Sequence, residues 1–219
     1  FKLNTKTNKT HTCRGRPEHL ETYHGTKKMV TDDIGERYLN IGSGDVILPK
    51  PFENLDGRDI PGIDHVVQGL DKLPFEDNTF DLVYSAHTLE HFARNDVEKV
   101  LKEWVRITKV GGLVRISVPD FEQMIKVYKK TDNRIENILG PVMGGQTYDY
   151  EYHYCLFDNR SLTELMNKCG LTAVHKWAYQ RVIHGDCWDY SQAHIFEIPI
   201  SLNLEGRKVS DKNSVDGVN

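Results

Sequence analysis

The sequence predicts an α/β fold in which a mostly parallel sheet carries helices on both faces. Seven strand-like apolar runs alternate with polar and helix-forming segments along the chain. One amphipathic helix is clear, because Val97, Val100, Leu101, Trp104 and Val105 recur at helical spacing. Strands that alternate with helices pair in parallel, since each crossover brings the chain back to the same edge of the sheet. The seven runs span 37–41, 52–56, 65–68, 80–85, 112–118, 172–178 and 193–200.

Capping residues set the expected bounds of two helices. Asn95 or Asp96 provides an N-cap for the amphipathic helix, because a short polar side chain accepts a hydrogen bond from the first free N–H groups. A second helix is expected to start at Ser161, with Glu164 three residues later completing a capping box, and to end at Gly170. Ligands of such sheets bind at the carboxyl ends of the strands, so we look for the site there.

Charge divides the 219 residues into unequal parts. The net charge is −4, but residues 1–31 hold seven Lys or Arg against two Glu, a balance of +5, which leaves −9 on the remainder. We expect a polar, basic N-terminal arm over 1–36, one domain over 37–204 and a loose polar tail over 205–219. Residues 121–160 form a long insertion before the last predicted helix. An acidic body of this kind argues against nucleic acid as a partner.

Cysteine usage and hydropathy give an expectation for the compartment. Cys13, Cys155, Cys169 and Cys187 show no Cys-x-x-Cys pairing. We therefore expect free thiols in a reducing compartment and a cytoplasmic location. No apolar run approaches the roughly 18 residues that a membrane-spanning helix needs, so no membrane association is expected.

A glycine loop follows the first predicted strand. The run Tyr-Leu-Asn-Ile leads directly into Gly42-Ser-Gly44, and a second short apolar run ends at Asp56, twelve positions later. Glycine lets a ligand approach the backbone, and a carboxylate at the tip of the next strand can accept hydrogen bonds from ribose hydroxyls. This outline indicates a nucleotide-type site, which Ser85 at the end of the fourth run would also border. A nicotinamide-dependent oxidoreductase is disfavoured, because the third glycine of Gly-x-Gly-x-x-Gly is replaced by Ile47.

Further motifs follow the glycine loop in a fixed order. The string Leu-Pro-Phe-Glu-Asp-Asn-Thr-Phe-Asp at this distance from a glycine loop, with Leu-Glu-His after the next strand, is specific. In this order the motifs resemble the class I S-adenosylmethionine-dependent methyltransferases, in particular small bacterial methyltransferases of type 11. The resemblance covers about residues 37–200. It rests on Leu39–Gly44, Asn54–Asp56, Leu73–Asp81, His87–His91, Gly111–Gly112 leading into Ile116–Pro119, and Leu165–Gly170.

The resemblance implies a Rossmann-like sheet of seven strands with an antiparallel last strand, and S-adenosylmethionine as the cofactor. The cofactor would lie over Gly42–Gly44 with its ribose on Asp56. The 69–73 stretch would follow the adenine, and Ser85–His87 would approach the methionine end. The implied cofactor-binding residues are Asn40, Gly42, Ser43, Gly44, Asp56, Gly57, Leu70, Asp71, Leu73, Ser85 and His87.

Two residues depart from the family pattern. Asn40 stands where Asp or Glu is usual, which weakens or shifts a contact with the amino group of the cofactor. Val46 stands where a third glycine often lies, and the short step to Asp56 leaves little room for a full first helix. A module that binds the cofactor without catalysing a reaction is therefore the alternative to an active methyltransferase.

The string His87-Thr-Leu-Glu90-His91 also matches the His-x-x-Glu-His pattern of zinc proteases. On a helix, the two histidines would share one face, as a zinc site requires. A methyl group on a sulfonium is already activated, however, and no third ligand is evident at a fixed spacing. We therefore expect no metal, and we assign Glu90 and His91 to local capping and packing.

The end of the insertion is the candidate acceptor site. Residues 148–154 hold four of the ten tyrosines, and in an extended segment all four would face one side. Tyrosine suits an aromatic or sugar ligand, so a small molecule or a glycan is the expected acceptor, although no motif specifies the acceptor atom or an oligomeric state. His153 is the candidate general base, because imidazole titrates near neutral pH. Asp120 also falls on this edge, and we prefer a helix N-cap as its role.

Overall fold

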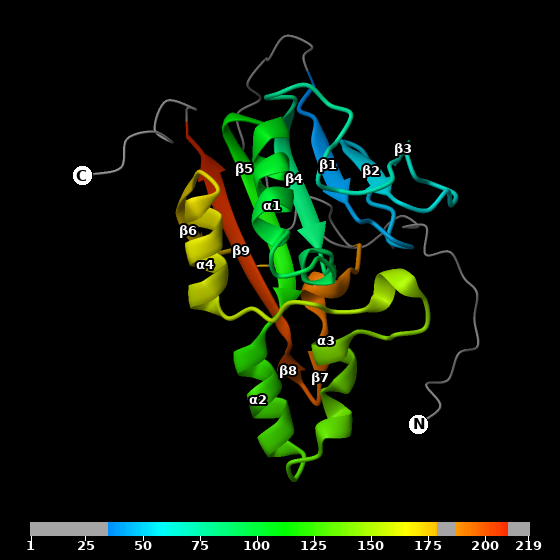
Figure 1. The fold of residues 1–219 in the computed structure, drawn as a ribbon, viewed down its shortest axis with the longest axis vertical. Helices are drawn as coiled ribbons and strands as arrows, with labels where there is room; N and C mark the ends of the chain where they lie inside the picture. The colour runs from blue at the N-terminus through cyan, green and yellow to red at the C-terminus, as the bar shows by residue number, and fades with distance from the viewer. Residues whose placement is uncertain (1–34, 179–186, 210–219) are drawn as a thin grey trace, which may run out of the picture.

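A seven-stranded mixed sheet forms the centre of the part of the chain that this computed structural model describes, residues 35–178 and 187–209 (Figure 1). The strand order is β3-β2-β1-β4-β5-β9-β6. Strands β1 to β5 pair in parallel, whereas β9 is antiparallel to both β5 and β6. The predicted fold class is therefore confirmed. The strands are β1 (Tyr38–Ile41), β2 (Phe52–Asp56), β3 (His65–Val66), β4 (Phe80–Ala86), β5 (Thr108–Pro119), β6 (Leu171–Lys176) and β9 (Ser201–Lys208).

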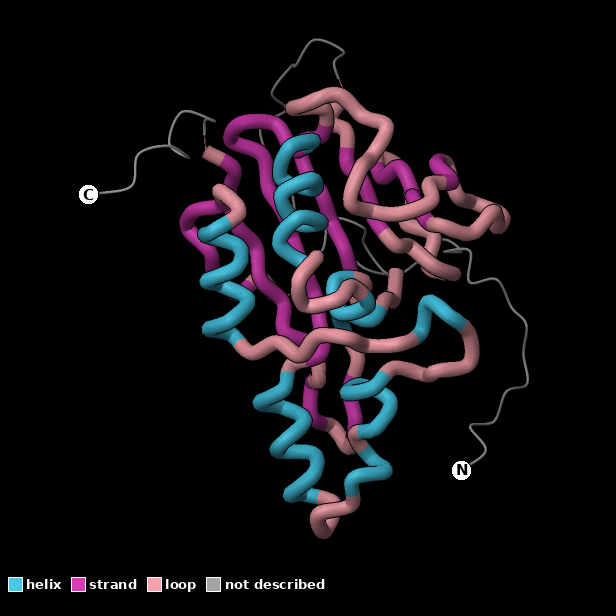
Figure 2. Tube along the Cα trace, in the orientation of Figure 1, coloured by secondary structure: helices cyan, strands magenta, loops and turns pink. Residues whose placement is uncertain are grey.

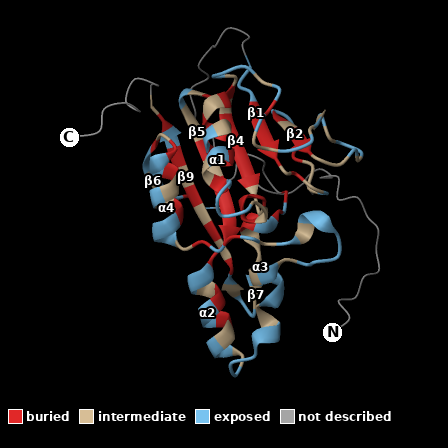
Figure 3. Cartoon of the chain, viewed as in Figure 1, coloured by how far each residue is buried: buried red, intermediate tan, exposed pale blue. Residues whose placement is uncertain are grey.

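Helices α1 (Val97–Ile107) and α4 (Asn159–Lys168) pack on one face of this sheet (Figure 1). The helical spacing that predicted α1 is confirmed, because Val100, Leu101 and Trp104 are fully buried. They join alternate residues of β1, β4 and β5 in one core, and burial is concentrated where the helices meet the strands (Figure 3). Burying one large apolar side chain contributes roughly 1.5–3 kcal/mol, so this layer is a main source of stability.

A row of aromatic side chains covers the opposite face. Tyr38 and Phe52 lie 5.4 Å apart between ring centroids, Phe52 and Tyr84 6.1 Å, and Tyr84 and Trp177 6.0 Å, all edge to face. Such pairs contribute about 0.5–1.5 kcal/mol each beyond their buried area. The row therefore ties β1, β2 and β4 to the segment that follows β6.

The connection between β1 and β2 consists of turns and irregular backbone in place of a helix (Figure 2). It is fixed by Asn54, whose Oδ1 accepts from the N–H of Leu48 (2.9 Å) and whose Nδ2 donates to the carbonyl of Leu48 (2.9 Å). Leu48 itself is buried. The expectation that a full first helix has no room is therefore confirmed.

Helix α4 begins two residues earlier than predicted. Its N-cap is Asp158, whose Oδ1 accepts from the N–H of Ser161 (2.7 Å) while the Ser161 hydroxyl accepts from the N–H of Asp158 (3.0 Å). Ser161 is therefore the third helical residue of the capping box and not its first. Glu164, which was expected to complete the box, is 69% exposed and pairs with Arg160.

The prediction that the last strand of the sheet spans 193–200 is wrong. Those residues form a two-stranded hairpin of β7 (His194–Ile195) and β8 (Ile198–Pro199), with the turn residues at positive φ. Pro199 has no N–H for a ladder in the centre of a sheet. The seventh strand of the main sheet is β9 instead, so the predicted boundary at 204 cuts this strand and 205–208 of the predicted tail belong to the sheet.

The insertion forms a small lobe beyond the carboxyl edge of the sheet (Figure 1). Its helix α2 (Phe121–Lys130) is capped by Asp120, whose side chain accepts from the N–H of Glu122 (3.0 Å), so the N-cap role preferred for Asp120 is confirmed. Met124 and Val127 of α2 pack on Ile200 in a separate core that includes the β7–β8 hairpin. The other elements of the lobe are η2 (Ile135–Asn137), α3 (Leu139–Met143) and η3 (Asp149–Glu151).

The cysteines depart from expectation at one position. Cys155 and Cys169 are free and buried, as predicted. Cys187 is disulfide-bonded, so the prediction of a free thiol is wrong there. Disulfides persist in oxidising compartments, and the cysteines therefore no longer support a reducing one. Cys13 and most of the predicted N-terminal arm lie outside the described residues.

Within the described residues, none of the helices combines the length and the apolar character needed to span a membrane.

Candidate functional site

The glycine loop lies where β1 ends, against the end of β2. The N–H groups of Gly42 and Ser43 both donate to the carbonyl of Leu55, at 2.8 and 3.0 Å. Gly42 and Gly44 have φ of +66° and +55°, a conformation that favours glycine. The Ser43 hydroxyl is buried and has no hydrogen-bond partner among the described residues. A buried polar atom without a partner needs an explanation, and a ligand over this loop would provide one.

A glycine is also needed at position 42 because the Thr88 side chain packs directly against it. A Cβ built on Gly42 would lie 2.3 Å from Thr88 Oγ1, whereas a Cβ on Gly111 would meet no atom within 4 Å at a similar φ of +80°. We expect Gly42→Ala to lower the free energy of unfolding by about 2–5 kcal/mol, because it adds a steric clash to the cost of a positive φ. Gly111→Ala, the matched control, should cost only about 1–2 kcal/mol. Urea unfolding of both variants tests this, and equal losses would contradict the packing role of Thr88.

Asp56 connects the loop to β2. Its Oδ2 accepts from the N–H of Gly44 (2.8 Å), and its Oδ1 accepts from the N–H and Nε of Arg58 (2.9 and 3.1 Å). The two residues that the sequence paired by spacing are therefore joined by a hydrogen bond. Sequence reasoning missed Arg58, although a cation two positions after the expected ribose carboxylate was visible in the sequence. A ribose on Asp56 must share the carboxylate with this guanidinium or displace it.

Two of the predicted cofactor residues use their side chains inside the fold. Asn40 is buried and donates from Nδ2 to Asn54 Oδ1 (3.1 Å) and to the carbonyl of Val46 (3.3 Å). Ser85 is buried, and its hydroxyl donates to the carbonyl of Ile41 (3.1 Å). These groups hold the ends of β1, β2 and β4 in place beneath the loop.

Residues 69–73, which were predicted to follow the adenine, are hydrogen-bonded to α1. The carbonyl of Leu70 accepts from Trp104 Nε1 (3.2 Å), and the N–H of Leu73 donates to a carboxylate oxygen of α1 (2.6 Å). Asp71 pairs with Lys99 at 2.5 Å, so its carboxylate faces the helix. Gly57 directly follows Asp56 at the end of β2. The stretch therefore has a fixed backbone, in which Leu70 is partly exposed and Leu73 is buried in the main core.

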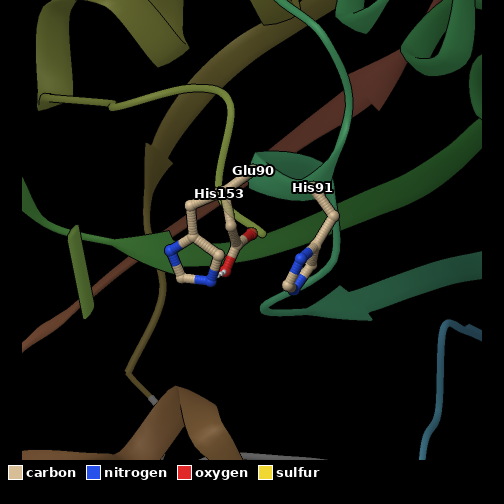
Figure 4. A group of neighbouring side chains, drawn as sticks. All are labelled: Glu90, His91 and His153. Atoms are coloured by element: carbon tan, nitrogen blue, oxygen red, sulfur yellow. Dashed lines mark ion pairs between the residues drawn. The ribbon is translucent and has the colours of Figure 1, made fainter. Parts of the chain in front are cut away.

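A second group of side chains gathers just after β4 (Figure 4). The turn η1 (Leu89–His91) carries Glu90, which is fully buried, and neither of its carboxylate oxygens has a hydrogen-bond partner among the described residues. Its Oε1 lies 3.4 Å from His87 Nδ1 and 3.9 Å from His153 Nε2. The rings of His91 and His153 are 4.7 Å apart. The packing role expected for Glu90 therefore leaves its polar atoms unexplained.

Burial controls the protonation of this group. It raises the pKa of Glu90 to about 8, and it lowers the pKa of His87 to about 3 and that of His153 to about 4. At neutral pH the carboxyl is therefore mostly protonated and the imidazoles are neutral. The short His–Glu distances are contacts between uncharged groups under these conditions and not ion pairs.

The end of the insertion lies along both groups. The Tyr148 ring is 5.8 Å from the guanidinium carbon of Arg58, and the N–H of Tyr154 donates to the carbonyl of Glu90 (2.8 Å). Tyr148 thus reaches the glycine loop through one intervening side chain. The prediction that four tyrosines face one side is wrong, because the helical turn η3 interrupts the extended segment and leaves Tyr150 63% exposed.

Sequence reasoning also missed two aromatic residues of the same edge. The Tyr190 ring lies 5.6 Å from the ring of His87 and 5.2 Å from that of Trp188. Both Trp188 and Tyr190 are more than half exposed. His87 is held by Ser201, whose hydroxyl lies 2.8 Å from its Nε2. The tryptophan and tyrosine two positions apart were visible in the sequence, but their place beside β4 depends on the return of the chain into β9.

Comparisons with known proteins agree with this geometry. Residues 39–116 match the family model of a methyltransferase domain. The chain is 31% identical over 150 residues to the demethylmenaquinone methyltransferase of Desulfitobacterium hafniense, covering 64% of this chain and 56% of that protein. It is 28% identical over 131 residues to the ubiquinone/menaquinone biosynthesis C-methyltransferase UbiE of Pseudoalteromonas translucida, covering 58% of this chain and 48% of the relative. The chain thus spans about half the length of the curated relatives it matches.

The fold is also found among solved structures. An SAM-dependent methyltransferase of Thermotoga maritima, described as a possible histamine N-methyltransferase, superposes with a TM-score of 0.53 at 20% identity and covers 80% of this chain and 82% of that one. This likeness concerns the fold alone. The family match covers the glycine loop and Asp56, so residues 39–116 of the chain form a methyltransferase domain.

Proposed function

We propose that this chain binds S-adenosylmethionine over Gly42–Gly44 and transfers its methyl group to a small-molecule or glycan acceptor. One observation carries the proposal: the glycine loop and Asp56 are joined at the carboxyl edge of the sheet by the bond from the N–H of Gly44, inside the matched domain. In open α/β sheets this edge is where ligands bind.

The residues present fit the cofactor. Gly42 and Gly44 have no side chains of their own, although Thr88 packs against Gly42 and Arg58 lies beside Gly44, and the buried Ser43 hydroxyl has no partner among the described residues. Asp56 would hold the ribose, and Leu70 and Leu73 would border the adenine. Bound there, S-adenosylmethionine supplies a methyl group already activated by its sulfonium.

The chain itself would then orient the acceptor relative to the methyl group and exclude water from the site. Holding two reactants in line can supply roughly 7–11 kcal/mol of the barrier reduction. The exposed rings of Trp188 and Tyr190 offer flat apolar area beside His87, which suits an aromatic or sugar acceptor. The insertion segment that contacts Arg58 and Glu90 covers the same edge and would close over the acceptor.

The names of the two curated relatives concern menaquinone and ubiquinone biosynthesis. A quinone precursor is an aromatic small molecule, and exposed aromatic side chains beside His87 are compatible with one. The chain matches only about half of the length of those relatives, so we propose the acceptor class, and not the quinone itself, for this chain.

We do not assign the general base to His153. With a pKa lowered to about 4, its ring removes protons less readily than an ordinary histidine does at neutral pH. Its Nε2 also faces the buried carboxyl of Glu90. An acceptor that is already nucleophilic needs no base, and the geometry described above suffices for it.

Calorimetry tests the proposal. We expect S-adenosylmethionine and S-adenosylhomocysteine to bind at one site with micromolar-range dissociation constants, and NAD not to bind. Transfer of radiolabelled methyl to a panel of quinone precursors, phenols and sugars then separates an enzyme from a non-catalytic module. Absence of binding by both adenosyl ligands at millimolar concentration would overturn the proposal.

A further inference from the structure

We propose that Glu90, His91 and His153 form a binding site for one divalent transition-metal ion, with Zn²⁺ the best match. One ligand atom of each residue lies within 4.8 Å of the others (Figure 4). The three come from two segments far apart in the sequence, η1 and the end of the insertion, which meet at the carboxyl edge of the sheet.

Glu90 supplies the first argument. Its side chain is completely buried, and neither oxygen has a hydrogen-bond partner among the described residues. Leaving a buried polar group without a partner costs free energy, and a bound cation is one of the few partners that would satisfy a carboxylate at this position. A bound cation would pair with the carboxylate directly.

The orientation of the two histidines supplies the second argument. The Nδ1–H of His91 donates to the carbonyl of Tyr152 (3.0 Å), and the Nδ1–H of His153 donates to the carbonyl of Pro141 (2.9 Å). A carbonyl only accepts, so in both neutral rings the proton is on Nδ1 and the lone pair is on Nε2. Metal-binding histidines are held in the same way, by donation of the second ring N–H to a carbonyl or carboxylate.

The donor set identifies the class of ion. Two imidazole nitrogens with one carboxylate form the ligand set of zinc sites that keep an open fourth position. Mg²⁺ and Ca²⁺ prefer oxygen ligands throughout and are disfavoured. Tetrahedral ligands about 2.0–2.1 Å from zinc lie about 3.3 Å from one another, so distances of up to 4.8 Å within the group must shorten by up to about 1.5 Å. The His153 side chain is only 10% exposed and both rings are held through Nδ1, so closure onto an ion requires a small shift of η1 and the end of the insertion toward each other.

The site would fasten the insertion beside the cofactor loop. Glu90 and His91 follow Thr88, which packs directly against Gly42, while His153 belongs to the insertion. An ion would therefore tie the segment that covers the edge to the core of the domain, with one coordination position left for water or an acceptor oxygen. The expectation of no metal rested on the lack of a third ligand, which the fold supplies 62 positions after His91.

Metal titration tests the inference. Tag-free protein is dialysed against EDTA and titrated with ZnCl₂ by calorimetry and with CoCl₂ by visible absorption, which reports the coordination geometry. We expect one ion per chain. Glu90→Gln and His153→Ala should each weaken zinc binding at least about 100-fold, because each removes a ligand or its charge. His175→Ala, which removes an exposed histidine elsewhere, should not change it.

Thermal unfolding of the variants separates the loss of a zinc ligand from a failure to fold. Glu90→Gln preserves the shape of the buried side chain, so its thermal transition without metal confirms that it folds. Zinc should raise the melting temperature of the wild-type protein and of His175→Ala, but not that of Glu90→Gln. Absence of zinc binding by the wild-type protein would overturn the inference, and so would zinc binding that persists unchanged in Glu90→Gln and His153→Ala.

Discussion

Asp56→Ala is expected to weaken the binding of S-adenosylhomocysteine by about 10- to 150-fold, because a hydrogen bond to a charged group contributes roughly 1.5–3 kcal/mol. The substitution removes the carboxylate proposed to hold the ribose. It also removes the acceptor of the Gly44 N–H, so the loop loses its anchor to β2. The measurement is the dissociation constant from calorimetry, together with a thermal transition that shows the variant is folded.

Two neighbours of Asp56 provide controls for this result. Asp45 lies 3.7 Å from Arg58 and its side chain is 85% exposed, so Asp45→Ala should leave the affinity nearly unchanged. Arg58→Ala removes the guanidinium that occupies Oδ1 and should bind the ligand at least as tightly as the wild type. An Asp56→Ala variant that binds as well as the wild type would contradict the ribose assignment.

Trp104→Ala is expected to lower the free energy of unfolding by about 3–5 kcal/mol, the range for truncation of a buried large aromatic side chain. Trp104 is fully buried between α1 and the sheet, and its Nε1 donates to the carbonyl of Leu70 (3.2 Å). Since whole domains are stable by about 5–15 kcal/mol, the loss is large. Urea unfolding measures it, and a loss below about 1 kcal/mol would show that Trp104 is not a core residue.

Trp104→Phe separates packing from the bond to Leu70. Phenylalanine fills most of the volume but cannot donate to the Leu70 carbonyl. We expect a smaller loss of stability than for alanine, together with a looser 70–73 stretch. Hydrogen exchange of the amides in this stretch reports that change. Exchange that is as slow as in the wild-type protein would show that the bond does not hold the stretch in place.

The sequence predicted those elements whose apolar residues are buried and also recur at the spacing of a single type of secondary structure. The helix around Trp104 was predicted because its apolar residues follow the helical period over the whole element. Strand β9 carries the period-2 alternation of a half-buried strand at Leu202 and Leu204, but the preceding run over 193–200, which is more apolar, was predicted in its place. Pro199 and the turn before it were the evidence against that run.

The candidate site likewise contains some contacts that the sequence predicts and others that only the fold creates. Gly42, Gly44 and Asp56 lie close together in the sequence and on adjacent strands, so their spacing alone predicts their contact. Glu90 and His153 are separated by 62 intervening positions, and only the path of the insertion brings them together. The contact of Tyr190 with His87 depends likewise on the return of the chain into β9. Long-range placement of this kind has no local signature.

A structure of the chain with bound S-adenosylhomocysteine tests the central claim most directly. We predict that the ligand lies over Gly42–Gly44, with its ribose hydroxyls within hydrogen-bonding distance of the Asp56 carboxylate and its adenine beside Leu70 and Leu73. A ligand found elsewhere would contradict the account, for example in the cavity of about 330 Å³ that Lys109 and Arg207 line near the start of β1, with Asp56 bonded only to Gly44 and Arg58.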